Sequence, residues 1–200
     1  MRDPTILFTD PGYIETGLLL FKDKSNPSLK TYNWLKSFIK NPLPETKDNR
    51  ILNKKSNYEI ESSTVVIHKT KTLLGLLNVC KLNEKETRSK VVYTMVHGDK
   101  EAFWIGFEMS RQHYYVNKDF TFAIGELKIE RNKYGKLFKK ICGNGSNICH
   151  SYNGELLYWN GHLYKDKLKN INKKGIYNVY FIAEDSINRW IPTMNEKLFF

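Results

Sequence analysis

Short apolar runs that alternate with segments of helical periodicity constrain the fold of this chain most. Residues 18–21 are uniformly apolar, and residues 61–68 pass from a polar entry into a β-branched run, so both segments predict strands. Residues 28–39 and 70–82 carry apolar residues at helical spacing, and the apolar face of the second segment includes Leu73, Leu74 and Leu77. Strands that alternate with helices predict an α/β fold.

The remaining segments predict fewer regular elements. A helix is predicted after Asp99, a hairpin over residues 150–159 around Asn153 and Gly154, and a further strand over residues 179–182. Residues 41–57 are polar, contain two prolines and predict an exposed loop. Residues 168–200 form a Lys- and Asn-rich C-terminal extension. From the length of 200 residues we expect residues 1–200 to form a single domain with a hydrophobic core.

Composition excludes several classes of protein. Hydrophobic residues make up 40% of the chain and aromatic residues 14%, which is too much for a disordered protein. No apolar run approaches the roughly 18 residues of a membrane-spanning helix. Three cysteines are too few for a disulfide framework, and their spacing does not suit a zinc site. Cys142 and Cys149 flank a glycine-containing loop, and we predict that they lie close together, as a disulfide requires.

The chain is strongly basic, with 32 Lys and Arg residues against 21 Asp and Glu residues and a formal net charge of +11. Only six of the 32 basic residues are Arg, the residue whose planar donors suit phosphates and base edges best. The lysines are also spread along most of the chain rather than gathered in one block. We therefore expect a solvated basic surface, and no nucleic acid as a partner.

One candidate site combines a carboxylate with two hydroxyl groups. Glu61, Ser62 and Ser63 stand at the polar entry of the predicted strand over residues 61–68. Strand ends line the ligand crevice of many open α/β sheets, and these side chains suit a polyhydroxylated ligand such as a sugar. A set of residues that caps a turn is an equally good interpretation of the local sequence.

The second candidate site lies at the start of the predicted helix after Asp99. Gly98 allows a close approach of the backbone to a ligand, and Asp99, Lys100 and Glu101 place three charges next to it. Capping of the helix by Asp99 and a favourable interaction of Glu101 with the helix dipole explain the same residues without a ligand.

Four segments, in order, resemble fungal α-mannosyltransferases of the Mnn1/Mnn2 type. They are residues 10–23, 61–69, 97–108 and 148–163, and the third, HGDKEAFWIGFE, matches that family almost residue for residue. The resemblance covers residues 3–167 and implies a glycosyltransferase of GT-A-like fold, with a mixed sheet flanked by helices. This chain would be the C-terminal part of the catalytic domain. Members of the family usually have glycine where this chain has Ser63.

The resemblance implies a retaining transfer of mannose from GDP-mannose to a mannose-terminated glycan, on a glycoprotein or on mannan of the fungal cell wall. It also implies Mn²⁺ under the diphosphate, a Golgi lumenal location and an N-terminal membrane anchor outside these residues. The metal-binding Asp-x-Asp of such enzymes does not occur in this sequence. We therefore expect a chain that starts just after that motif and is inactive alone. The alternative is a non-catalytic sugar-binding or scaffold remnant of such an enzyme.

Roles for single residues follow from the resemblance together with the chemistry. Asp99 and Glu61 are the predicted catalytic carboxylates, and His150 is the predicted metal ligand, although a structural role fits a lone histidine as well. Six further residues are predicted to contact the donor or acceptor: Ser62, Ser63, Gly98, Lys100, Glu101 and Trp104. For Trp104, a place in the core is the favoured alternative to stacking on a sugar.

Overall fold

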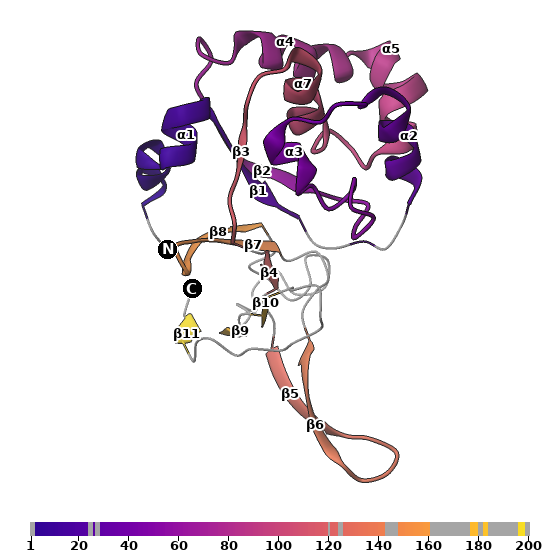
Figure 1. Cartoon of the computed structure of the whole chain (residues 1–200). Helices are drawn as coiled ribbons and strands as arrows, with labels where there is room; N and C mark the ends of the chain where they lie inside the picture. The colour runs from indigo at the N-terminus through magenta and orange to yellow at the C-terminus, as the bar shows by residue number, and fades with distance from the viewer. Residues whose placement is uncertain are drawn as a thin grey trace. The chain divides into compact units, whose positions relative to one another are not determined.

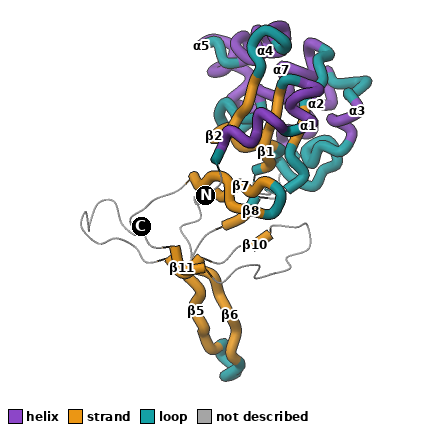
Figure 2. The backbone as a smooth tube through the Cα atoms, turned by 90° about the vertical axis from the view of Figure 1, so that its left-hand side faces the viewer, coloured by secondary structure: helices purple, strands orange, loops and turns teal. Residues whose placement is uncertain are grey.

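The computed structural model describes residues 3–23, 26, 29–119, 121–123, 126–142, 148–160, 177–179, 182–183 and 196–198. It divides into two compact units, residues 1–119 and 120–200, where the sequence led us to expect a single domain. Figure 2 shows that the helices gather in the first unit, whereas the described part of the second consists of strands and loops. In the described part of the chain, no helix has the length and apolarity needed to cross a bilayer.

The first unit is built on a three-stranded mixed sheet in the order β2-β1-β3. Strand β1 (Leu18–Lys22) pairs antiparallel with β2 (Ile60–Ile67) and parallel with β3 (Tyr115–Val116). These strands confirm the two strongest strand predictions and the mixed character of the predicted sheet. Figure 1 shows the helices of this unit arranged around the sheet.

The helical elements of the first unit are mostly short. In chain order they are η1 (Pro4–Thr9), α1 (Pro11–Thr16), α2 (Lys30–Phe38), α3 (Pro44–Lys47), α4 (Leu73–Leu82), α5 (Lys85–Thr87), η2 (Arg88–Val92), α6 (Tyr93–Met95) and α7 (Ala102–Ser110). Helices α2, α4 and α7 confirm the three helices predicted from the sequence.

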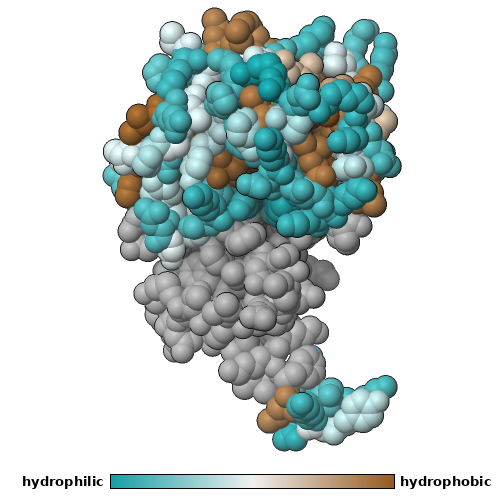
Figure 3. Space-filling view, viewed as in Figure 1, coloured by the Kyte–Doolittle hydropathy of each residue, from teal (hydrophilic) through white to brown (hydrophobic). Residues whose placement is uncertain are grey.

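Helices α4 and α7 pack closely because a glycine stands at the contact on each side. A Cβ atom on Gly75 of α4 would lie 2.6 Å from the ring of Phe107, and one on Gly106 of α7 would lie 2.8 Å from the backbone N of Val79. The glycine side of α4 is therefore its buried side, and the predicted inward face of Leu73, Leu74 and Leu77 is wrong. These three leucines are exposed, and Figure 3 shows an apolar patch on the surface where α4 lies.

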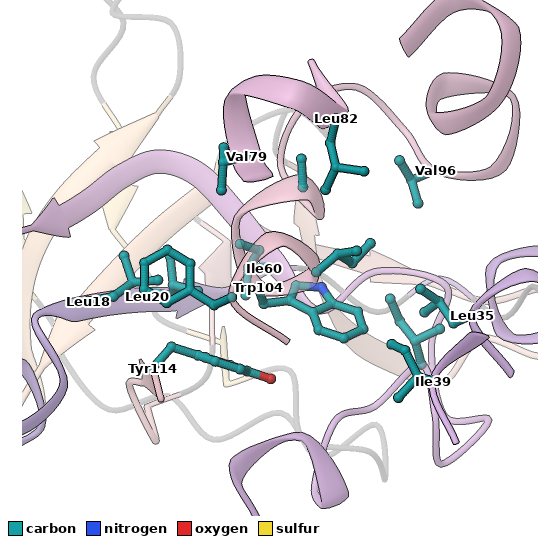
Figure 4. Close-up of a cluster of buried hydrophobic side chains, with 14 of the residues drawn as sticks. Leu18, Leu20, Leu35, Ile39, Ile60, Val79, Leu82, Val96, Trp104 and Tyr114 are labelled. Carbon is teal, nitrogen blue, oxygen red and sulfur yellow. The ribbon is translucent and has the colours of Figure 1, made fainter. Parts of the chain in front are cut away.

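The core of the first unit centres on Trp104, which contacts apolar residues from the sheet and from α2. Figure 4 shows its indole ring between Leu18 and Leu20 on one side and Leu35 and Ile39 on the other. The complete set of buried core residues is Leu18, Leu20, Leu35, Ile39, Leu43, Ile51, Ile60, Val79, Leu82, Val92, Val96, Ala102, Trp104, Ile105, Phe107 and Tyr114.

Residues 41–57 differ from the exposed loop that was predicted. Leu43 and Ile51 belong to the core, and Thr46 of α3 is fully buried against Glu108 and Tyr114. The buried carboxylate of Glu108 accepts hydrogen bonds from the Thr46 hydroxyl and from the backbone N of Leu43, which hold this segment inward. Sequence patterning alone does not reveal such donors to a buried carboxylate that lies 62 or more positions away.

The regular elements in the described part of the second unit are all strands. A four-stranded antiparallel sheet has the order β10-β4-β7-β8, and β5 pairs with β6 and β9 with β11. The bounds are β4 (Phe122–Ala123), β5 (Glu126–Arg131), β6 (Leu137–Cys142), β7 (Ile148–Tyr152), β8 (Glu155–Asn160), β9 (Tyr177–Val179), β10 (Ile182–Ala183) and β11 (Glu196–Leu198).

The predicted hairpin is confirmed in β7 and β8. Its two-residue turn consists of Asn153 and Gly154, whose φ angles of 52° and 76° are those that a tight hairpin turn requires. Of the predicted single strand over residues 179–182, Val179 ends β9 and Ile182 begins β10, two strands of different sheets, and residues 180–181 lie outside the described residues, as does most of the predicted extension 168–200. Cys149 is buried, and the side chain of Cys142 lies outside the described residues, so their pairing stays a prediction.

Candidate functional site

An irregularity in β2 creates the most unusual feature of the sheet. Leu19 of β1 is opposite Val66, but Phe21 is opposite Glu61, so two steps along β1 correspond to five along β2. Three residues of β2 are therefore extra, and they follow Glu61. We call residues 62–64 the hydroxyl bulge, because all three carry a hydroxyl group. Bulges of this kind redirect side chains and occur often beside active sites.

The hydroxyl bulge also explains how β2 keeps its apolar residues toward one core. Side chains alternate along a strand, so an odd number of extra residues reverses the alternation. Ile60 before the bulge and Ile67 after it both contact the same core, although seven positions separate them. The bulge thus interrupts the ladder without turning either end of β2 away from the core.

Hydrogen bonds fix the hydroxyl bulge to both predicted catalytic carboxylates. Glu61 Oε2 accepts from the backbone N of Ser63 at 2.7 Å and also from the Ser63 hydroxyl. Ser62 Oγ donates to Asp99 Oδ1 at 3.1 Å, although 37 positions separate the two residues. The structure therefore brings Glu61, Ser62, Ser63 and Asp99 together, as expected for one site. Whether both carboxylates face one cleft stays a prediction.

Asp99 lies in a turn that leads into α7. Gly98 has a φ of 72°, a backbone conformation that favours glycine, and the Asp99 side chain is exposed. The N-cap residue of α7 is Glu101, and its side chain forms no capping hydrogen bond. Asp99 therefore does not cap α7, and among the described residues its side chain bonds Ser62.

Lys100 points in a different direction from Asp99. Its ammonium group forms an ion pair with Asp23, the residue that follows β1, and lies 3.4 Å from the centre of the Tyr58 ring. Only 12% of the Lys100 side chain is exposed. The predicted contact of Lys100 with the donor stays a prediction, but its charge is already balanced inside the protein.

Glu101 and Trp104 lie in the interior. Glu101 is 0% exposed and accepts from Trp104 Nε1 at 2.6 Å and from the backbone N of Glu59 at 2.9 Å. Burial raises the pKa of Glu101 to about 8, although both hydrogen bonds oppose that shift. Trp104 therefore lies in the core, which was the favoured alternative to stacking on a sugar. Glu101 lies in the core beside it.

Glu59 is a second buried carboxylate next to this site. Arg50 compensates it, since its backbone N donates to Glu59 Oε2 at 2.6 Å and its guanidinium donates to both the Glu59 side chain and the Glu59 carbonyl. Burial nevertheless raises the pKa of Glu59 above its ordinary value. Sequence patterns predicted no role for Glu59, Asp23 or Tyr58. The charge of Asp23, directly after an apolar strand, is a sequence feature that could have indicated a role for this residue.

His150, the predicted metal ligand, belongs to β7 of the second unit. It is 2% exposed, and its ring stacks on Tyr158 with 6.3 Å between ring centres. Within the residues that the structure describes, no group of three His, Cys, Asp or Glu side chains could hold a metal ion. The described residues thus add no further ligands to His150, and its metal-binding role stays a prediction.

A groove lies at the other end of α7 from Asp99. Phe38, Ile39, Met109 and Arg111 are among the residues that line it, and Arg111 donates to Glu108 Oε1 at 2.7 Å. None of the predicted site residues lines this groove.

Comparison with known proteins identifies relatives over most of the chain. A protein of Candida albicans named "Putative alpha-1,3-mannosyltransferase MNN12" is 24% identical over 97% of this chain and 27% of its own length. The "Alpha-1,3-mannosyltransferase MNT3" of Saccharomyces cerevisiae is 26% identical over 82% of this chain and 30% of its own. A further C. albicans protein, "Putative alpha-1,3-mannosyltransferase MNN1", is 31% identical over 64% of this chain and 17% of its own.

The chain thus spans less than a third of the length of each of these three relatives. The protein family described as "Mannosyltransferase putative" matches residues 1–151, which is about three quarters of the 200 residues and includes the whole site around Asp99. The chain therefore belongs to this mannosyltransferase family.

Proposed function

We propose that this chain is part of a retaining α-mannosyltransferase that transfers mannose from GDP-mannose to a mannose-terminated glycan. The observation that carries the proposal is the exposed carboxylate of Asp99, which a hydroxyl group of the bulge holds at a glycine turn. The names of the relatives support an α-1,3 linkage. A GT-A fold and a Golgi lumenal location belong to the same proposal, through the family that the chain resembles.

The proposed role of Asp99 is electrostatic. Glycosyl transfer passes through a transition state in which the anomeric carbon carries positive charge, and a carboxylate placed beside it lowers the barrier. Ser62 donates a hydrogen bond to Oδ1 of Asp99, so the Asp99 side chain is already ordered before the sugar binds. Glu61 keeps the hydroxyl bulge in place through Ser63 and is the second carboxylate within reach of a sugar bound there.

The same bonds break and form overall in either retaining route. The bond from the anomeric carbon to the diphosphate breaks, and a bond from that carbon to the acceptor oxygen forms. The proton of the acceptor hydroxyl passes to the departing diphosphate or to a carboxylate. A covalent intermediate on a carboxylate and a front-face reaction are the two routes that this chemistry allows.

Mn²⁺ enters the proposal through the family resemblance. The described residues do not fit it, because they contain no set of three ligating side chains. No step proposed here depends on the metal. The sequence also lacks an Asp-x-Asp, and this observation favours the second candidate, a sugar-binding chain without catalytic activity.

Binding measurements on the 200-residue chain test the proposal. We expect GDP-mannose and methyl α-D-mannopyranoside to bind, as observed by ligand-detected NMR, and Asp99→Asn and Ser62→Ala to weaken the mannoside about 10-fold. Glu86→Gln, which removes an exposed carboxylate of α5, is the matched control. The proposal is wrong if neither ligand binds, while binding of both without any transfer to a mannoside acceptor supports the second candidate for this chain.

A further inference from the structure

The turn that presents Asp99 is attached to the sheet at two points. Lys100 forms an ion pair with Asp23, directly after β1. Glu101 accepts the backbone N–H of Glu59, directly before β2, at 2.9 Å. The two strand ends are themselves joined, because Asp23 N donates to the Glu59 carbonyl at 3.0 Å. We call Asp23, Glu59, Lys100 and Glu101 the strand-end clamp.

The ion pair of the clamp is well shielded from water. The Asp23 side chain is 4% exposed, and the Lys100 ammonium lies over the Tyr58 ring as well as against the carboxylate. Salt screens such a pair little, and a cation held by both a carboxylate and an aromatic ring has little freedom. An incoming diphosphate would have to break this pair to recruit Lys100, so the geometry does not favour that role.

The consequence for Asp99 follows from its place in the chain. Asp99 lies between Gly98, whose positive φ sets the direction of the turn, and Lys100, whose side chain is fixed. The hydrogen bond from Ser62 holds the Asp99 side chain, whereas the clamp holds its backbone. Groups that stabilise charge act best when they are already in place, because no reorganisation is then needed during the reaction.

We infer that the strand-end clamp positions Asp99 for the sugar, with Asp23 and Lys100 as positioning residues rather than ligand contacts. This inference rests on the proposed function, in which Asp99 faces the mannose. It gives Asp23 a role in the site and replaces the predicted contact of Lys100 with the donor.

The test uses the 200-residue chain with Asp23→Asn, Lys100→Met and the double variant. Each single variant removes one of the two charges of the buried ion pair and is expected to be destabilised. The double variant removes both charges, and Met keeps an unbranched side chain over Tyr58, so it is expected to fold. The matched control is Lys81→Met with Glu84→Gln, which removes an exposed ion pair.

Two readouts separate positioning from stability. The backbone order parameter of Asp99, from ¹⁵N relaxation without ligand, is expected to fall from about 0.85 to below about 0.6 in the double variant and to stay unchanged in the control. The affinity for methyl α-D-mannopyranoside is expected to fall about 10-fold in the double variant, while its melting temperature stays within a few degrees of the parent.

An Asp99 amide that stays rigid in the double variant, or an affinity equal to that of the parent, would overturn the inference. If the parent chain binds neither the mannoside nor GDP-mannose, the proposed function fails, and the order parameters still decide whether the clamp holds Asp99.

Discussion

At the scale of single residues, Glu101 shows how strongly burial controls this site. Its carboxyl has a pKa of about 8 in the folded chain because the core excludes water, against an ordinary value of 4.5. Between these two pH values the folded chain keeps a proton that the unfolded chain has released. The stability from protonated Glu101 is therefore fully present below pH 4.5 and is lost as the pH rises through about 8.

We predict that the free energy of unfolding of the parent falls by about 2–4 kcal/mol between pH 5 and pH 8. Glu101→Gln keeps the shape and one of the two acceptor oxygens but has no proton to lose, so the variant is less stable at low pH and its stability should depend much less on pH. Urea unfolding at several pH values measures both. A residual decrease of the same sign is expected from Glu59, whose pKa burial also raises.

Glu86→Gln is the control for this prediction, because Glu86 is exposed and its replacement should leave the slope with pH unchanged. A Glu101→Gln variant whose stability falls as steeply as that of the parent would show that Glu101 is ionised in the folded chain.

The sequence predicted which chemical groups residues 98–101 bring to the site, but not where their side chains point. It identified a glycine followed by three charges at the start of a helix, and α7 does begin there. It could not show that Asp99 is exposed while Lys100 and Glu101 turn inward. Those directions depend on the φ of Gly98 and on partners distant in the sequence, Ser62 and Asp23, which no local pattern reveals.

At the scale of elements, the hydroxyl bulge belongs to the proposed site, whereas the rest of β2 makes the contacts with the core. Without residues 62–64, Glu61 would be followed by Val65, which would then lie opposite Leu20 and restore a regular ladder with β1. Ile60, Val65 and Ile67 would still alternate toward the core, because they already contact it. The fold therefore does not need these three residues.

We predict that deletion of residues 62–64 leaves a cooperatively folded chain but weakens binding of methyl α-D-mannopyranoside at least about 10-fold, since Asp99 loses its hydroxyl partner. Thermal unfolding and an NMR titration are the measurements. Deletion of residues 62–65 is the matched control, because one further residue reverses the alternation, turns Ile67 away from the core and should abolish cooperative unfolding. Parent-like binding after the shorter deletion would contradict a functional bulge.

The contact between α4 and α7 gives a second prediction at this scale. Helix propensity alone predicts that Gly106→Ala stabilises α7 by up to about 1 kcal/mol. The new Cβ atom would lie 2.8 Å from the backbone N of Val79, however, and backbone cannot move aside locally. We predict a net loss of about 2 kcal/mol in the free energy of unfolding, because the two helices must separate.

Denaturant unfolding measures this loss, and Leu77→Ala on the exposed side of α4 should change stability by less than about 0.5 kcal/mol. A stabilised Gly106→Ala variant would show that the helices accommodate the methyl group.

These elements also show what sequence patterning can and cannot predict. The strands β1 and β2 and the helices α2, α4 and α7 followed from periodicity, which is a local property. The buried face of α4 and the bulge did not, because each depends on a second element. Gly75 matters only when Gly106 lies opposite it, and the extra residues of β2 become visible only in the register with β1.

At the scale of the whole molecule, the chain spans less than a third of the length of each of the three relatives compared. A decisive test of catalysis therefore places this chain in a complete relative. In the S. cerevisiae relative, the segment that matches 82% of this chain can be replaced by the matching residues of this chain. We expect the graft to transfer mannose from GDP-mannose to an α-mannoside acceptor.

Asp99→Asn in that graft is the last prediction. The amide keeps the size of the side chain and can still accept a hydrogen bond from Ser62, but it carries no charge. Because the charge matters most when the anomeric carbon becomes cationic, kcat should fall about 100-fold or more, while the KM for GDP-mannose changes less than about 3-fold. Glu86→Gln in the same graft should leave both constants unchanged. Equal losses in kcat and in affinity would make Asp99 a binding group, and an active Asn variant would remove it from the chemistry altogether.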